Sequence, residues 1–233
     1  MKKKLVITML VAILTLAIVM ADPDPLGATL TPGQSSRGTN TDASSNPQNA
    51  QAGNVTQLNI NQSRITQIWQ GYYGNVSGQI VLENSGGDRF YDWTYTAVTG
   101  EVYASRNTIP DWSTINCTNS TQWEAEESSL NIASADTDGI NETYDTVTHP
   151  TFQVGTKTIP SNYCQATRPY NNAGAPGAWY NVLMNSNSTN TVYVVVLSED
   201  QTAFDGSTAD FELLVPTDKS SGLATYYFYV ELA

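Results

Sequence analysis

Two cysteines and one histidine are the residues of this 233-residue chain with the most specific chemistry. Cys117 and Cys164 make an even pair, which in an oxidising compartment favours one disulfide over two free thiols. A catalytic thiol would need a nearby base, and the single histidine, His149, precedes Pro150 in a context that favours a turn. We therefore expect a structural disulfide. Closing its loop of about 48 residues would stabilise the fold by roughly 4 kcal/mol in the chain-entropy model.

An acidic segment between residues 134 and 145 has the spacing of a degenerate calcium loop. Oxygen donors fall at its positions 1, 3, 5, 9 and 12, and a glycine stands at position 6, where such loops turn. The carboxylates among these donors are Asp136, Asp138, Glu142 and Asp145. Position 12 is Asp rather than the usual bidentate Glu, so we favour the alternative of a solvated acidic turn. Calcium is the one cofactor that the sequence suggests.

Aromatic residues are plentiful, with 5 Trp and 13 Tyr. Flat aromatic faces beside Asp, Asn and Gln bind sugars, because stacking supplies affinity and polar edges supply orientation. The candidates for such a ligand site are Trp69, Tyr72, Tyr73, Trp112, Trp123 and Trp179. Aromatic residues also fill the cores of β-sandwiches, and core packing is the alternative that we favour.

Seven Asn-x-Ser/Thr motifs are candidate N-glycosylation sites if the protein is exported. They begin at Asn54, Asn61, Asn75, Asn116, Asn119, Asn141 and Asn187. Most fall at expected turns or strand ends, where a bulky polar glycan fits. Asn75, which follows a glycine, is alternatively a turn residue with positive φ.

Signatures of familiar catalytic sites are missing from the sequence. It contains no Gly-x-Ser-x-Gly elbow, His-Glu-x-x-His motif, phosphate-binding loop or Cys-x-x-Cys pair. Carboxylate pairs such as Asp111 with Glu124, or Glu199 with Asp205, could flank a glycosidic bond, which leaves a secreted hydrolase as an alternative. We expect a protein that is not an enzyme.

Charge argues against several classes of partner. Only 14% of the residues are charged, against roughly 25% in a typical soluble domain. Beyond residue 21 the chain carries 22 acids and 7 bases, a formal net charge of −15. Such an anionic surface repels phosphate groups, so we expect binding neither to nucleic acid nor to acidic lipid.

The first 21 residues have the pattern of an export signal. Three lysines at positions 2–4 precede an apolar run from Leu5 to Ala21. Segment 1–21 is therefore a signal peptide cleaved near Ala21 or, alternatively, a retained N-terminal anchor, which would be the expected membrane contact. Under either interpretation, the rest of the chain lies at the cell surface or outside the cell.

Residues 22–52 contain no aromatic residue, Val or Ile. Such a segment buries too little apolar surface to offset its ordering entropy, so we expect a flexible linker rich in Ser, Thr, Pro and Asn. From residue 53 apolar and polar residues alternate. Residues 53–233 are therefore expected to form one domain, with a first strand at Gly53 to Ile60.

Alternation also predicts the later strands of this domain. Two alternating runs flank a turn signal at 85–88 and predict a β-hairpin over residues 77–96, with Ile80 and Leu82 on one face of the first strand. Further strands are expected over residues 101–105, 191–197, 210–215 and 225–232. The run 191–197 is apolar on both faces, which is typical of a central, doubly covered strand.

One segment, residues 120–133, is expected to be helical because Thr121-x-x-Glu124 resembles a helix start signal. The predicted fold is therefore all-β: a single, mostly antiparallel β-sandwich of about eight to ten strands with one short helical insertion.

Several motifs resemble those of a group of secreted archaeal surface proteins without assigned function. They include Trp69-Gln-Gly-Tyr-Tyr-Gly-Asn-Val-Ser-Gly78, Asp210-Phe-Glu-Leu-Leu-Val-Pro216 and Tyr226-Tyr-Phe-Tyr-Val-Glu-Leu232. The resemblance covers about residues 53–233. It implies an archaeal envelope or extracellular protein and transfers no catalytic residue.

Together these features predict an exported, N-glycosylated surface or extracellular protein with a structural or adhesive role, whose partners are cell-envelope glycans or other surface proteins. A glycan-binding module is one alternative. Another is a filament subunit in which the strand at 53–60 leaves its own sheet and completes a neighbour's.

Overall fold

A computed structural model of the chain describes residues 24–39, 47–60, 62–108 and 110–233. The export segment 1–21 and the glycosylation motif at Asn61 lie outside the described residues. Of the helices within those ranges, none combines the length and apolar character that crossing a bilayer requires.

Short antiparallel strands make up most of the regular structure, as the alternation predicted. The strands are β1 (Leu26–Gly27), β2 (Trp69–Gly74), β3 (Gln79–Glu83), β4 (Arg89–Thr94), β5 (Gly100–Ser105), β6 (Asn116–Cys117), β7 (Phe152–Val154), β8 (Lys157–Ile159), β9 (Ala166–Thr167), β10 (Tyr180–Ser186), β11 (Asn190–Val196), β12 (Gln201–Thr202), β13 (Thr208–Ala209), β14 (Phe211–Pro216) and β15 (Tyr227–Leu232). The helical segments are η1 (Trp112–Thr114), α2 (Ser120–Ser129) and α3 (Ile140–Thr143).

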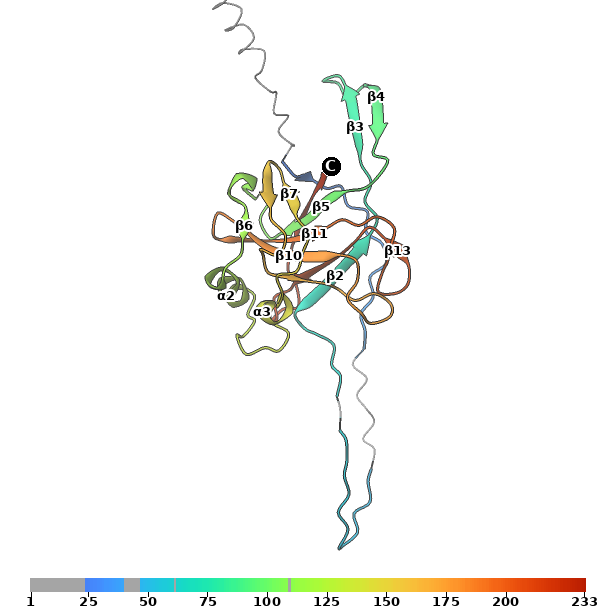
Figure 1. The fold of residues 1–233 in the computed structure, drawn as a ribbon, viewed down its shortest axis with the longest axis vertical. Helices are drawn as coiled ribbons and strands as arrows, with labels where there is room; N and C mark the ends of the chain where they lie inside the picture. Colours follow the sequence, from blue (N-terminus) through green and yellow to red (C-terminus); the bar gives the residue numbers. More distant parts are fainter. Residues whose placement is uncertain (1–23, 40–46, 61, 109) are drawn as a thin grey trace, which may run out of the picture.

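A seven-stranded sheet forms the centre of the molecule (Figure 1). Its order is β1-β15-β5-β11-β10-β6, and β9 also pairs with β10. The two-stranded sheet of β2 and β14 packs against β10 and β11. The predicted all-β, sandwich-like fold is thus confirmed. The two layers are unequal, because β2–β14 covers only part of one face and helices complete the layer.

Alternating side chains of the central strands enter two separate cores. Leu183 of β10 and Val195 of β11 are buried beside Leu213 of β14. Their neighbours Val182 and Val194 point to the opposite face and are buried beneath the segment that contains β7 and β8. β11 is therefore apolar on both faces and central in the sheet, as its sequence predicted.

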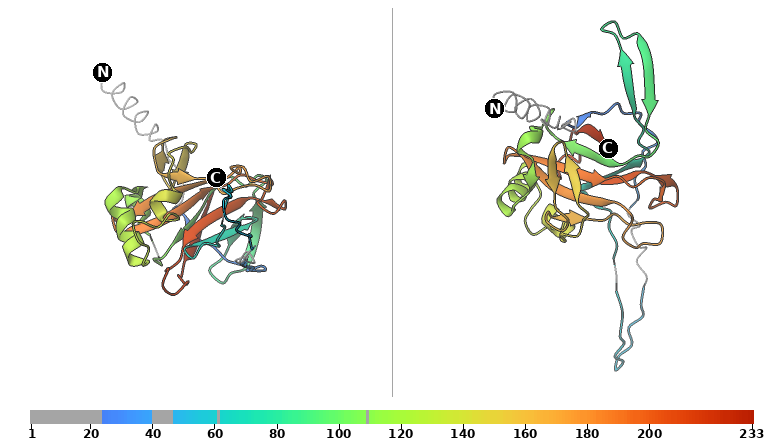
Figure 2. Two further views of the ribbon diagram at one scale, coloured as in Figure 1. Left: turned by 90° about the horizontal axis from the view of Figure 1, so that it is seen from below. Right: turned by 45° about the horizontal axis from the view of Figure 1, so that its top comes forward.

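The predicted linker is partly a strand. Leu26 and Gly27 form β1 and pair with Val230 and Tyr229 of β15. A flexible linker was expected here because apolar residues are scarce. An edge strand, however, is held by backbone hydrogen bonds and needs few apolar side chains. Residues 28–39, 47–60 and 62–67 then form two extended, largely exposed arms outside the body (Figures 1 and 2).

The strand expected at Gly53 to Ile60 is not formed. These residues lie in the second arm, are exposed, and belong to no ladder of the described chain. Alternation identifies a segment that suits a sheet, but a strand also needs a neighbour, and this arm extends beyond the reach of the body's other strands. The first strand after the arms is β2.

The predicted hairpin at 77–96 is present as β3 and β4, joined by a turn at residues 84–88. Its root is anchored on the body, since Gly78 lies so close to Leu232 and Tyr95 that any side chain at 78 would displace them. Beyond the root, the hairpin projects from the end of the molecule opposite the two arms (Figures 1 and 2).

The predicted helix is present as α2, but its start differs from the prediction. The N-cap is Asn119, whose side chain accepts from the Gln122 amide at 3.1 Å while the Gln122 side chain accepts from the Asn119 amide at 2.9 Å. This capping box precedes the expected signal at Thr121 by two residues. Within the helix, Glu126 is buried and receives two hydrogen bonds from Arg106, at 3.0 and 2.7 Å, which fasten α2 to the end of β5.

Candidate functional site

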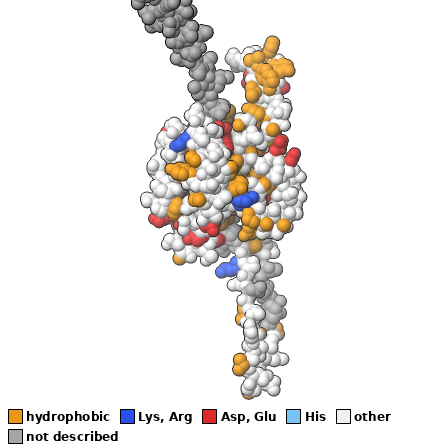
Figure 3. Space-filling model, viewed as in Figure 1, with side chains coloured by type: hydrophobic (Ala, Val, Ile, Leu, Met, Phe, Trp, Pro, Cys, Tyr) orange, Lys and Arg blue, Asp and Glu red, His pale blue; other side chains and the backbone are white. Residues whose placement is uncertain are grey.

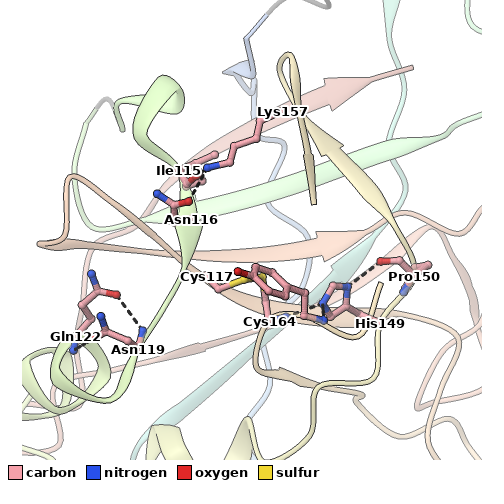
Figure 4. Close-up of a disulfide and its surroundings, with 10 residues drawn as sticks. Ile115, Asn116, Cys117, Asn119, Gln122, His149, Pro150, Lys157 and Cys164 are labelled. Carbon is pink, nitrogen blue, oxygen red and sulfur yellow. Dashed lines mark hydrogen bonds between the residues drawn. A yellow bond between two sulfur atoms is a disulfide. The ribbon is translucent and has the colours of Figure 1, made fainter. Parts of the chain in front are cut away.

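The predicted disulfide joins Cys117 of β6 to Cys164, with 5.0 Å between their Cα atoms (Figure 4). His149 lies beside it. Its Nε2 accepts hydrogen bonds from the amides of Tyr163 and Cys164, at 3.1 and 2.9 Å, and its Nδ1 lies 2.7 Å from the Pro150 carbonyl. This network requires a neutral ring protonated at Nδ1. His149 Nε2 is therefore engaged in holding the backbone amides of Tyr163 and Cys164 next to the disulfide.

The six glycosylation motifs within the described residues all place their asparagine at the surface. Asn187 occupies the turn between β10 and β11 and has a positive φ of 55°. Asn75 has no positive φ, so its alternative role as a left-handed turn residue is not observed. Asn116 is engaged within the fold, because its Nδ2 donates to the Thr114 carbonyl and its Oδ1 accepts from Lys157 (Figure 4).

The other three motifs differ in how far their side-chain amide is engaged. Asn54 Nδ2 donates to Gln51, at 3.3 Å, and Asn141 Nδ2 donates to Glu142, at 3.4 Å. Asn119 uses its Oδ1 as the cap of α2. The amide nitrogens of Asn75, Asn119 and Asn187 make no hydrogen bond to any described residue, so these three present the acceptor atom most openly.

The acidic segment does not bring together the carboxylates of the candidate calcium site, the interpretation that we did not favour. Asp136 accepts from the Lys219 ammonium, at 2.5 Å, and from the Ala133 amide, at 2.8 Å, and these two contacts lower its pKa. Asp138 instead accepts from the Thr66 hydroxyl, at 2.6 Å. Nowhere in the described ranges do three or more potential metal-ligating side chains come together. Each carboxylate therefore fastens a different part of the chain.

The other two carboxylates of the segment lie in and after α3, which begins at Ile140. Glu142 belongs to α3, Asp145 follows it, and both are exposed. The start of α3 is held by Glu127 of α2, whose buried Oε1 accepts from the amides of Ile140, at 2.8 Å, and Asn141, at 3.3 Å. The segment is thus a turn and a short helix.

The four tryptophans proposed as ligand-binding residues are largely enclosed. Trp112 and Trp179 are buried, one in each core, and Trp69 and Trp123 pack partly buried against the first core. Core packing therefore accounts for these four residues, as the alternative interpretation held.

The two tyrosines behave differently. Tyr73 is 46% exposed and meets the ring of Phe204, 55% exposed, edge-on at 5.1 Å. Its hydroxyl donates to Asp205 at 3.2 Å, and this hydrogen bond and the Asp205 charge raise the pKa of Tyr73. Tyr72 is also exposed and packs edge-on against Phe228, at 5.1 Å. An exposed aromatic pair beside a carboxylate thus lies at the β2 edge.

A contiguous exposed apolar surface lies on the hairpin, where the sequence did not indicate a site. Ile80 pairs with Trp93 and Leu82 with Tyr91, so these four side chains share one face of the β3–β4 ribbon. Each is 50–58% exposed. We call this surface of Ile80, Leu82, Tyr91 and Trp93 the apolar ribbon face. Figure 3 shows hydrophobic side chains gathered on the projecting hairpin.

Polar residues occupy the other face of the ribbon. Arg89 contacts Asp92 at 3.1 Å and Gln79 at 3.2 Å, and Val81 is the apolar residue among them. Phe90, 84% exposed, stands at a β-bulge opposite the step from Leu82 to Glu83. The ribbon is therefore amphipathic, and its apolar side faces solvent.

Two adjacent strands of the central sheet, β5 and β15, carry a pair of buried carboxylates. Glu101 of β5 and Glu231 of β15 are direct cross-strand partners, 5% and 7% exposed. Glu231 accepts from the Tyr103 hydroxyl, at 2.9 Å, and from the Gly155 amide, at 3.0 Å. Burial, and next the charge of Glu231, raise the pKa of Glu101 from 4.5 to about 8, although the Gln153 amide opposes this shift.

Comparisons with protein-family models, curated proteins and solved structures found no match to this chain. Its function is therefore inferred from its residues and their geometry.

Proposed function

We propose that this chain is an exported, N-glycosylated protein of the cell surface or extracellular space, with a structural or adhesive role in an archaeal envelope. The observation that carries the proposal is the projecting ribbon with its uncovered apolar face. Soluble proteins seldom leave a contiguous apolar surface in water unless it binds something, and a two-stranded ribbon alone is only marginally stable.

Three further features support export. The first 21 residues have the pattern of a signal peptide or N-terminal anchor. The cystine between Cys117 and Cys164 fits an oxidising compartment. Exposed Asn-x-Ser/Thr motifs offer acceptors such as Asn75 and Asn187 to a glycosylation enzyme.

Intact-mass measurement of the native protein, combined with cell fractionation, tests the proposal. We expect a surface or extracellular protein with the two-hydrogen mass loss of one cystine and with added sugar mass. A cytosolic protein with two free thiols and no added mass would refute it.

A glycan-binding role is a second candidate, favoured by the exposed pair of Tyr73 and Phe204 beside Asp205. Sugar rings stack on such aromatic surfaces while a carboxylate accepts their hydroxyl hydrogen bonds. A glycan array probed with the wild type and with Tyr73→Ala tests this role. Equal signals from the two proteins, or no signal from either, would exclude this site.

A further inference from the structure

Within the part of the chain that the structure describes, the apolar ribbon face lacks a partner. The ribbon projects from the body beyond its root, and in the described chain β3 and β4 pair only with each other (Figures 1 and 2). Its four side chains lie on one side while Arg89 and Asp92 form an ion pair on the other. One face of the ribbon thus carries the ion pair, and the other carries only apolar and aromatic side chains.

We infer that the apolar ribbon face binds the same face of a second copy of this chain, so that two ribbons stack into a small two-layer sandwich. This inference rests on the proposed structural or adhesive role and names the partner. Two flat faces of identical composition are self-complementary, as a two-fold symmetric interface requires. Stacking would also give each ribbon the second layer that an isolated pair of strands lacks.

The exposed area is sufficient for such a contact. The four residues of the face are each about half exposed. Because a fully enclosed aromatic side chain buries roughly 150–250 Å², one copy offers on the order of 400 Å². Two copies together then bury about 800 Å², which is the size of a weak, reversible interface.

The charges on the ribbon do not oppose a second copy. The apolar ribbon face contains no ionisable group other than the Tyr91 phenol, and Glu83, Arg89 and Asp92 stay on the solvent side of the stacked ribbons. The contact therefore removes apolar area from water without burying a carboxylate, although each copy is strongly acidic.

The tip of the ribbon argues against insertion into lipid. Asn84 Oδ1 accepts from the amides of Gly86 and Asp88, each at 2.9 Å, and Asn84 Nδ2 donates to the Asp88 carboxylate at 2.9 Å. A ribbon that entered a bilayer tip first would have to desolvate this polar, charged turn. The side of the ribbon, and not its tip, is therefore the binding surface.

Sedimentation velocity over a range of concentrations tests the inference. The sample is the mature protein, purified from the cells that produce it. We expect a reversible dimer for the wild type. The double variant Leu82→Thr/Trp93→Thr keeps residues that favour strands but removes apolar area from the face, so its dimer should dissociate on the order of 100-fold more readily. Val81→Thr, on the opposite face of the same ribbon, is the matched control and should dimerise like the wild type.

Two further measurements separate the other possible partners. The variant Leu58→Ser/Ile60→Ser alters the exposed arm, and loss of the dimer in this variant would indicate a head-to-tail contact and overturn the inference. Flotation of the wild type, but not of the face variant, with phosphatidylcholine vesicles would assign the face to lipid and overturn it as well. The face variant should keep its circular dichroism spectrum and its cystine, which shows that its body is folded.

The dimer and the proposed function can fail separately. A wild-type monomer at all concentrations, carrying glycan and cystine at the cell surface, would refute the dimer alone. A cytosolic, unmodified protein would refute the proposed function, whatever its oligomeric state.

Discussion

Replacing Glu101 by glutamine should change how the stability of this protein depends on pH. In the folded state the pKa of Glu101 is raised to about 8, chiefly by burial and then by the charge of Glu231, whereas its ordinary value is 4.5. Between these two values the folded protein holds a proton that the unfolded chain releases. The free energy of unfolding is therefore greatest below pH 4.5, falls as the pH rises toward 8, and levels off above it.

The magnitude follows from the size of the pKa shift. Each pH unit inside this window lowers the free energy of unfolding by about 1.4 kcal/mol, so the wild type should lose roughly 3 kcal/mol between pH 4.5 and 7 through this group. Glu101→Gln has no proton to lose and keeps a side-chain oxygen to accept from the Gln153 amide. The variant should gain roughly the same amount at pH 7 relative to the wild type, and gain little at pH 4.5.

Urea unfolding at several pH values, followed by tryptophan fluorescence, measures this difference. Glu124→Gln makes the same substitution at an exposed position of α2 and should leave the pH dependence unchanged. If Glu101→Gln and the wild type lose stability in parallel from pH 4.5 to 8, the argument from the buried carboxylate pair is wrong.

Three further substitutions test how the body is held together. Replacing Cys117 and Cys164 with alanine should lower the free energy of unfolding by about 2–4 kcal/mol, and an unchanged melting temperature would contradict a stabilising cystine. Glu127→Ala removes the acceptor of the buried Ile140 amide and of the neighbouring Asn141 amide, so it should cost about 2–3 kcal/mol and speed hydrogen exchange of those amides; unchanged exchange would count against the cap. His149→Leu removes the acceptor for the two amides beside the disulfide and should cost about 1–3 kcal/mol in urea unfolding, whereas full stability would show that the ring is dispensable.

The features that the sequence predicted well are those that depend on local pattern and residue counts. The run 191–197 is apolar at successive positions, and the structure places it as β11, covered on both faces. Two cysteines can form only one intramolecular pair, and that disulfide is present. Alternation over 210–215 likewise predicted a strand with Phe211, Leu213 and Val215 on one face, because a period of two fixes which side chains share a face. In β14, Leu213 and Val215 are buried in the first core and Phe211 packs partly buried against it.

The features that the sequence did not reveal depend on partners distant in sequence. The spacing of Asp136 suited a calcium loop, the interpretation that we did not favour, and Lys219 from 83 residues away instead contacts its carboxylate. Alternation at 53–60 had no neighbouring strand, while Leu26 and Gly27, with no strand pattern, found one in β15. The hairpin was predicted from its turn and alternation, but a period of two does not reveal whether the apolar side meets a core or solvent.

The place of β15 in the central sheet constrains the order in which the molecule can fold. β15 lies between β1 and β5 and joins residues 26–27 to residues 229–230, about 200 positions apart. Until residues 227–232 form β15, β1 has no described strand to pair with, and one edge of β5 lacks backbone hydrogen bonds. Such distant pairing makes folding slow. For the export that we propose, this delay would be useful, because the sheet stays open until most of the chain has passed through the translocation pore.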